Sequence, residues 1–229
     1  MKHTVIIPLY NKEDSIFCTI SSLAFQEKKP SQIVIVDDFS TDKSVLNLKD
    51  ALSFFAPQFL LTTIEVIELK ENKGYGNAKN IGLERANGDL ISFLDADDYY
   101  TYTCLDEVNS IMEKENLAAL ILGILLVPSE NYLPDIKSFE TEPDSISNDL
   151  FLICNVLHTI FLPGFLIGNN VVIKRKYLEN IRFETAFSLS TKTDFWYRVL
   201  KSLDKYNRIG FLNKPCIEIR DTKCDSFRF

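Results

Sequence analysis

Three carboxylates crowd residues 95–98, where the sequence reads DADD. They follow the apolar residues 90–94 (LISFL), so we expect them at the end of a buried strand, where a dry core meets solvent. Anionic groups this close repel one another, and a divalent cation would offset that repulsion. Oxygen ligands suit Mg²⁺ or Mn²⁺, which keep open positions for the phosphate oxygens of a substrate. The run therefore indicates a metal and diphosphate site, and the alternative is a solvated acidic turn that caps the next helix.

A second polar cluster, residues 37–42 (DDFSTD), follows a β-branched apolar run at residues 32–36. Asp38 is placed to accept hydrogen bonds from a nucleobase N–H group or a ribose hydroxyl. For Asp42 we expect helix capping, because an acidic side chain before a helix accepts hydrogen bonds from its free N–H groups. Asp37 is the other candidate for that capping role.

Two more segments have types and spacing that suit a ligand. Residues 8–13 (PLYNKE) follow the apolar run at residues 4–7, and the ring of Tyr10 either stacks on a base or is an ordinary half-buried tyrosine. Residues 73–76 (KGYG) precede a predicted helix, and a lysine, two glycines and a helix N-terminus together favour an anion. This segment matches neither the P-loop nor the GxGxxG pattern.

These clusters need a sheet to bring them together, and the first hundred residues predict one. Four β-type runs begin about 28 residues apart, the length of a strand–helix–strand unit, at residues 4–7, 32–36, 63–69 and 90–94. Apolar stripes at helical spacing fill the gaps, at Ile16, Ile20 and Leu23, at Val45, Leu48, Leu52 and Phe55, and at Ala78, Ile81 and Ala86. Gly88 is expected to cap the third helix. Right-handed crossovers then give an open, mostly parallel α/β sheet that binds ligands at the carboxyl ends of its strands.

The pattern weakens beyond residue 100. The remaining predicted elements are a helix over residues 105–115, a strand over 118–127, a strand over 171–173 and a helix over 193–203. Residues 128–148 are polar and contain three prolines, which is typical of a long surface loop or flap.

Composition narrows the class of protein. The chain has 229 residues, of which 46% are hydrophobic and 25% charged, which suits a globular domain. A net charge of −7 argues against a nucleic-acid partner. Five cysteines without a CxxC motif and only two histidines argue against zinc and favour free thiols in a reducing compartment. The apolar runs at residues 117–127 and 151–167 are short or interrupted, so we expect a soluble cytoplasmic protein, with peripheral contact to the inner face of a membrane as an alternative.

Taken in chain order, these clusters resemble the motifs of family 2 glycosyltransferases of the GT-A fold. The matching stretches are residues 5–13, 35–42, 72–82 and 87–98. The resemblance implies a single Rossmann-like α/β GT-A domain over residues 1–229, its mostly parallel central sheet flanked by helices. Residues 1–102 would form the nucleotide-sugar-binding half, and residues 103–229 the less regular acceptor-binding half.

The same likeness assigns roles to individual residues. It implies that the donor, a nucleotide-diphosphate sugar with a lean to UDP, contacts Pro8, Tyr10, Glu13, Asp38, Lys73, Lys79, Asp95 and Ala96. Asp38 would read the base, whereas Lys73 and Lys79 would lie near the phosphates or brace their loop. Asp97 would hold Mn²⁺ or Mg²⁺ together with Asp95, and Asp98 would assist or stay structural. The acceptor would be a saccharide, a lipid-linked saccharide or a protein.

The chain departs from the family where a catalytic base belongs. Residues 193–200 resemble the helix that carries the family's Glu-Asp pair, and two registers are open. In one, Thr191 and Lys192 occupy the Glu-Asp positions; in the other, Asp194 is the base and Thr193 replaces the glutamate. An inverting transfer needs a carboxylate to take the acceptor proton, which a charged lysine cannot do. Asp194 is therefore the candidate base, and the alternative is that it only caps its helix.

A second departure concerns the metal. No histidine stands in the C-terminal segment that resembles the family's metal-completing region, and Asp221 is the substitute candidate there.

Three functions follow from these observations. The first is an active, metal-dependent, inverting glycosyltransferase of polysaccharide, lipopolysaccharide or glycan biosynthesis. The second is a non-catalytic nucleotide-sugar-binding domain that acts with a partner. The third, a nucleotidyltransferase, would need a glycine-rich loop that residues 8–11 lack.

Overall fold

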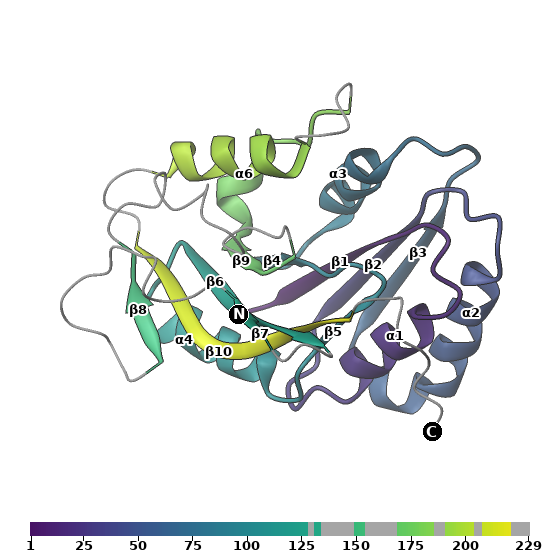
Figure 1. The fold of residues 1–229 in the computed structure, drawn as a ribbon, viewed down its shortest axis with the longest axis horizontal. Coiled ribbons are helices and arrows are strands. Elements are labelled where there is room, and N and C mark those ends of the chain that lie inside the picture. The colour runs from purple at the N-terminus through teal and green to yellow at the C-terminus, as the bar shows by residue number, and fades with distance from the viewer. Residues whose placement is uncertain (128–130, 134–148, 154–168, 186–190, 204–207, 221–229) are drawn as a thin grey trace.

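The computed structural model describes residues 1–127, 131–133, 149–153, 169–185, 191–203 and 208–220. A single sheet runs through these residues in the order β3-β2-β1-β4-β9-β6-β10-β5, with β7 paired to β6 and β8 paired to β10 (Figure 1). Helices cover both faces of the sheet. The predicted α/β fold class, with a central sheet flanked by helices, is confirmed.

The first half of the sheet is parallel, as the sequence predicts. It consists of β1 (His3–Leu9), β2 (Gln32–Asp37), β3 (Thr63–Glu68) and β4 (Leu90–Phe93). β1 pairs in parallel with both β2 and β4, and β2 pairs in parallel with β3. Every residue of β1, β2 and β4 is buried, which explains why these strands read as continuous apolar runs rather than as alternating ones.

Two hydrophobic cores form, one on each face of the sheet. On one face lie α1 (Ile16–Ala24), α2 (Ser44–Phe54) and α4 (Cys104–Lys114); on the other lie α3 (Tyr75–Arg85) and α6 (Thr191–Ser202) (Figure 1). Successive residues of a strand point to opposite faces. Val5 and Ile7 therefore pack into the first core, whereas Ile6 packs into the second.

The second half of the sheet mixes strand directions. Its strands are β5 (Asp98–Tyr100), β6 (Ala119–Val127), β7 (Asn131–Leu133), β8 (Leu150–Leu152), β9 (Val171–Lys174) and β10 (Ile209–Arg220). β9 runs antiparallel to both β4 and β6, whereas β10 runs parallel to β6. The described residues also include the short 3₁₀ helices η1 (Ala56–Phe59) and η3 (Arg175–Leu178).

The four helices and strands predicted beyond residue 100 are confirmed within a few residues, as α4, β6, β9 and α6. β10 is not predicted, because Lys214 and Pro215 interrupt its apolar pattern, and the register with β6 shifts on both sides of Pro215. Apart from β7, the loop predicted over residues 128–148 lies outside the described residues.

Glycine lets α3 approach the sheet closely. Gly74, directly before the helix, has φ +88°, a conformation that side chains disfavour. Within the helix, a Cβ added to Gly82 would lie 2.3 Å from Cγ2 of Ile6, so α3 packs almost directly on β1.

The predicted role of Gly88 as the cap of α3 is wrong. The helix ends at Arg85, and Ala86 follows in extended conformation. The N–H group of Gly88 donates a 3.0 Å hydrogen bond to Oγ1 of Thr4, and a Cβ at this position would meet the backbone of Thr4 at 2.8 Å. The glycine is needed for packing against β1.

Two expectations from composition can be compared with the described residues. Cys18, Cys104 and Cys216 are not joined in disulfide bonds, in line with the expected thiols, while Cys154 and Cys224 lie outside the described part. Within the described part, no helix combines the length and the apolar character that crossing a membrane would require.

Candidate functional site

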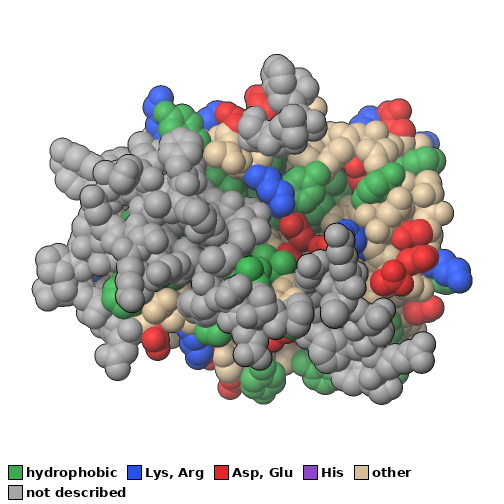
Figure 2. Space-filling view, in the orientation of Figure 1, with side chains coloured by type: hydrophobic (Ala, Val, Ile, Leu, Met, Phe, Trp, Pro, Cys, Tyr) green, Lys and Arg blue, Asp and Glu red, His purple; other side chains and the backbone are tan. Residues whose placement is uncertain are grey.

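The carboxyl ends of β1, β2 and β4 surround a pocket of about 480 Å³, a volume in the range that small-molecule ligands occupy. The described residues that line it are Pro8, Leu9, Tyr10, Lys12, Asp38, Asn72, Gly74, Tyr75, Ala78, Asp95, Ala96 and Asp97. Figure 2 shows acidic side chains in a hollow near the middle of this face, with basic side chains at its edges. The pocket therefore lies where an open α/β sheet is expected to bind its ligand.

Six of the residues expected to hold a nucleotide sugar or its metal are brought together here. They are Pro8, Tyr10, Asp38, Asp95, Ala96 and Asp97. Tyr10 follows β1, and 44% of its surface is exposed, so its ring is accessible to a ligand. Asp38 follows β2 and the acidic pair follows β4, and β1 lies between these two strands in the sheet.

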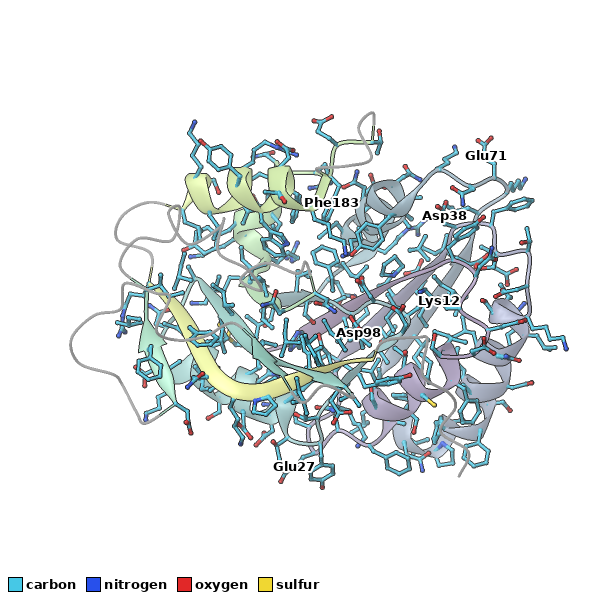
Figure 3. All side chains as sticks on the ribbon, viewed as in Figure 1. Lys12, Glu27, Asp38, Glu71, Asp98 and Phe183 are labelled. Atoms are coloured by element: carbon cyan, nitrogen blue, oxygen red, sulfur yellow. The ribbon has the colours of Figure 1, made fainter. Side chains whose placement is uncertain are left out.

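Asp38 ties β2 to the loop that precedes α3. Its two carboxylate oxygens accept hydrogen bonds of 2.7 Å each from the N–H groups of Lys73 and Gly74. The residue is 3% exposed, yet it contributes to the pocket wall (Figure 3). A carboxylate offers about four lone-pair sites in all. Asp38 can therefore shape the loop and still accept a hydrogen bond from a ligand.

Asp95, which follows β4, lies at the centre of a charged cluster. The Tyr75 hydroxyl donates a 2.8 Å hydrogen bond to Oδ1 of Asp95. Nζ of Lys79 lies 3.6 Å from the same oxygen, contacts the Tyr75 hydroxyl and stands 4.0 Å from the centre of the Tyr75 ring. Lys79 is fully buried, and its Nζ also lies 4.6 Å from the centre of the Phe93 ring. Lys79 therefore packs against both Tyr75 and Asp95.

Burial and charge set the protonation of this cluster. Burial lowers the pKa of Lys79 to about 7, although the charge of Asp95 opposes the shift. Burial also raises the pKa of Tyr75 well above its usual value, and Asp95 adds to that, so the hydroxyl remains a hydrogen-bond donor at neutral pH. Burial alone would raise the pKa of Asp95, but the ammonium groups of Lys79 and Lys192 bring it below the usual value. Asp95 is therefore a carboxylate.

The other two aspartates of the run point in different directions. Asp97 lines the pocket and forms an ion pair with Lys12. Asp98 is 5% exposed and accepts a hydrogen bond from the side-chain amide of Asn169 (Figure 3 marks Asp98). Burial, together with the charges of Asp95 and Asp97, raises the pKa of Asp98 to about 8. Of the three aspartates of this run, Asp95 and Asp97 are among the described residues that line the pocket, and Asp98 is not.

This donor set can be compared with what a divalent metal requires. Among the described residues, no group of three or more His, Cys, Asp or Glu side chains could hold a metal ion. Asp95 and Asp97 nonetheless supply hard oxygen donors, and Mg²⁺ is commonly held by one or two carboxylates together with substrate phosphates. The residues therefore fit a metal that is completed by a phosphate ligand. Asp221, the candidate third ligand, lies outside the described residues.

Two predicted nucleotide contacts have other partners. The carboxylate of Glu13 accepts a 2.8 Å hydrogen bond from the N–H group of Lys43, directly before α2. Asp42 accepts the N–H group of Ser44 at 2.9 Å, which confirms its predicted capping role. Lys73 contributes its backbone to the site, whereas its Nζ pairs with Glu71 at 3.1 Å. Neither Glu13 nor Lys73 is among the described residues that line the pocket.

α6 presents a lysine to the site, not the expected aspartate. Nζ of Lys192 lies 3.4 Å from Oδ2 of Asp95. Asp194 instead pairs with Arg198, four residues further along the helix, at 2.6 Å. Residues two apart on a helix do not share a face. The structure therefore does not bring Asp194, the candidate base, to the pocket.

Lys12 and Tyr75 have no individual role among the sequence-based predictions, and Lys192 appears there only as the occupant of one of the Glu-Asp positions. A signal existed for Tyr75, because it stands four residues before Lys79 and such pairs meet on a helix surface. No local signal places Lys192 beside Asp95, since that contact depends on how α6 packs against the rest of the fold.

Comparisons with known proteins agree with this architecture. The sequence model described as "Glycosyl transferase family 2" matches residues 4–182. Poly(ribitol-phosphate) beta-N-acetylglucosaminyltransferase TarS of Staphylococcus aureus is 29% identical over 147 residues, which are 63% of this chain and 24% of TarS. The Escherichia coli UDP-Glc:alpha-D-GlcNAc-diphosphoundecaprenol beta-1,3-glucosyltransferase WfaP is 34% identical over 119 residues, 50% of this chain and 42% of WfaP.

Solved structures extend the likeness to nearly the whole chain. A crystal structure of S. aureus TarS 1-349 in complex with UDP-GlcNAc has a TM-score of 0.75 and 24% sequence identity, and the match covers 98% of this chain and 60% of that one. Because the sequence identity is only 24%, this match establishes the fold alone. The chain thus corresponds to a part of each of these relatives. With the family model matched over most of its length, the chain belongs to glycosyl transferase family 2.

Proposed function

We propose that this chain binds a nucleotide-diphosphate sugar, with UDP as the nucleotide, and transfers the sugar to a hydroxyl group. The acceptor would be a saccharide, a lipid-linked saccharide or a protein in polysaccharide, lipopolysaccharide or glycan biosynthesis. The observation that carries the proposal is the pocket at the strand ends, which Tyr10, Asp38, Asp95 and Asp97 line together. The names of WfaP and of the TarS complex, which mention UDP-Glc and UDP-GlcNAc, support the choice of nucleotide.

The residues that line the pocket suit both the base and the diphosphate of such a donor. The accessible ring of Tyr10 provides a stacking surface for a base, and the remaining lone pairs of Asp38 can accept a base N–H group. Asp95 and Asp97 would hold Mn²⁺ or Mg²⁺ beside the diphosphate, and the metal would neutralise negative charge on this leaving group. The described residues therefore position the donor from β1, β2 and β4, all parts of one rigid sheet.

The transfer would be a single displacement with inversion. The acceptor oxygen forms a bond to the anomeric carbon while the bond from that carbon to the diphosphate oxygen breaks. The electron pair of the broken bond stays with the nucleoside diphosphate, and the acceptor hydroxyl loses its proton to a base. Enclosure of the diphosphate in the pocket keeps the leaving group in a fixed position during this step.

One observation favours a second function, a nucleotide-sugar-binding domain that is not itself catalytic. The group that α6 presents at the pocket is the ammonium of Lys192, while the carboxylate of Asp194 pairs with Arg198. Under this function the chain would bind the donor and leave the transfer to a partner. Turnover separates the two functions, because only the transferase releases UDP from a UDP-sugar when an acceptor is supplied.

The experiment that tests the main proposal is calorimetric titration of the chain with UDP, GDP, CDP and ADP, each with and without Mn²⁺. We expect UDP to bind most tightly and Mn²⁺ to strengthen its binding. Asp97→Asn should remove the effect of Mn²⁺, and Asp50→Asn, a change on the exposed surface of α2, should not. If none of the four nucleotides binds, the proposal fails. UDP release from UDP-GlcNAc or UDP-Glc with an added acceptor mixture then distinguishes the transferase from the binding domain.

A further inference from the structure

Lys192 brings a positive charge from the second half of the chain to the rim of the pocket. It lies on α6, and its Nζ stands 3.4 Å from Oδ2 of Asp95 and 4.7 Å from the centre of the Tyr75 ring. Asp95 and Tyr75 both line the pocket. The Lys192 side chain is 40% exposed, so solvent and ligands can reach it.

Asp95 has other partners besides Lys192. Its Oδ1 accepts a hydrogen bond from Tyr75 and lies 3.6 Å from the buried Lys79. The 3.4 Å separation between Lys192 and Oδ2 exceeds the usual hydrogen-bond length. The Lys192 side chain is also more exposed than that of Asp95, so an anion that enters the pocket can approach its ammonium group.

A second lysine stands at the same acidic run. Lys12 forms an ion pair with Asp97, and its side chain is 37% exposed. Asp95 and Asp97 thus each have an accessible ammonium group beside them. An anion that enters between these groups meets positive charge from α6 as well as from the loop that follows β1.

We propose that Lys192 binds the diphosphate of the nucleotide donor. This inference rests on the proposed function, which places the diphosphate beside Asp95 and Asp97. The ammonium would contact phosphate oxygens rather than the nucleoside, because it lies beside Asp95, after β4, whereas Tyr10 follows β1 and Asp38 follows β2. Lys192 occupies a position where a carboxylate base was one of the expectations, and under this proposal it binds phosphate instead.

This role predicts a loss of affinity that depends on the phosphates of the ligand. A hydrogen bond to a charged group contributes about 1.5–3 kcal/mol, so Lys192→Gln should weaken UDP binding by about tenfold or more. The same change should leave the affinity for uridine within about twofold, because uridine has no phosphate. UMP should show an intermediate loss, and Lys192→Arg should keep most of the affinity for UDP because it keeps the charge.

The experiment measures the affinities of UDP, UMP and uridine for the wild type, Lys192→Gln, Lys192→Arg and Lys201→Gln. Lys201 is the matched control, an exposed lysine further along α6, and its removal should change none of the affinities. Equal losses for UDP and uridine in Lys192→Gln, or no loss for UDP, would overturn the inference while leaving the proposed function in place. A wild-type chain that binds none of the three ligands would overturn both.

Discussion

The hydroxyl of Tyr75 donates a 2.8 Å hydrogen bond to the carboxylate of Asp95. This contact joins the first residue of α3 to the second residue after β4, so it links a helix to the acidic run. A hydrogen bond to a charged group in a buried setting is among the stronger interactions of its kind. The position of the Asp95 carboxylate is therefore set by α3 as well as by the strand that precedes it.

Replacing Tyr75 with phenylalanine should destabilise the fold. The change removes the donor to Asp95 and a contact of the buried Lys79, and losing a hydrogen bond to a charged group costs about 1.5–3 kcal/mol. Urea unfolding followed by circular dichroism measures this as a drop in the free energy of unfolding. Tyr102→Phe serves as the control, because Tyr102 is 63% exposed. Equal stability of the two variants would contradict the importance of this hydrogen bond.

Asp38→Asn should loosen the loop before α3. An asparagine places an NH₂ group where one carboxylate oxygen now accepts the N–H group of Lys73 or Gly74, so one of the two 2.7 Å hydrogen bonds is lost. Amide hydrogen exchange at these two positions should become faster, and UDP should bind about tenfold more weakly because the pocket wall loses its shape.

The control for this change is Asp50→Asn, a replacement of the same type on the exposed face of α2. It should alter neither the exchange of the two loop amides nor the affinity for UDP. Unchanged exchange at Lys73 and Gly74 in Asp38→Asn would show that the carboxylate does not hold the loop.

The stability of the fold should fall on mild acidification because of His3. This residue is 1% exposed; its Nε2 lies 2.9 Å from Oγ of Ser92, and its Nδ1 lies 3.3 Å from the Asn109 amide nitrogen. Burial lowers its pKa to about 3, and the positive charges of Lys28 and the N-terminus add to the shift. The unfolded chain binds a proton near pH 6.5 and the folded chain does not, so stability is lost as the pH falls from 6.5 toward 3.

Between pH 7 and pH 5 this single group should remove about 2 kcal/mol from the free energy of unfolding. His3→Gln cannot titrate, so its stability should change less over the same interval, even if the variant is less stable at both pH values. Urea unfolding at pH 7 and pH 5 compares the two proteins. An identical loss of stability in both would show that His3 is not the group responsible.

Much of the first half of the fold can be predicted from the sequence because its signals are local. β1 and β2 are buried on both faces, so they read as unbroken β-branched runs, and the helices between them carry apolar stripes. The sequence does not predict β10, because Pro215 and the polar residues before it interrupt the apolar pattern of a strand that pairs with β6. A pattern of local hydrophobicity does not report pairing between strands that lie far apart in the chain.

The same division applies to the candidate site. Asp38, Asp95 and Asp97 can be predicted because each follows a strand, and strand ends meet at one edge of the sheet. Glu13 also comes shortly after a strand, yet its carboxylate accepts a hydrogen bond from the N–H group of Lys43, directly before α2. The position of Lys192 depends on the packing of α6 against the second core, which no local pattern encodes.

The geometry of α6 leads to a prediction about Asp194. Its carboxylate pairs with Arg198 at 2.6 Å, and Arg198 also donates a 2.7 Å hydrogen bond to the backbone oxygen of Arg182. A partly exposed pair at this helical spacing contributes about 0.3–0.5 kcal/mol. Asp194→Asn should therefore lower the free energy of unfolding by about that amount and leave the affinity for UDP unchanged.

The effect on turnover decides whether Asp194 is the catalytic base. A general base contributes about 10²–10⁴-fold to the rate, whereas loss of a surface ion pair should change the rate of sugar transfer by less than about threefold. We expect the small change, and Arg198→Gln, which breaks the same pair from the other side, should match Asp194→Asn in both stability and rate. A hundredfold loss of kcat in Asp194→Asn alone, with UDP still bound, would instead identify Asp194 as the base and require α6 to turn this carboxylate toward the pocket during catalysis.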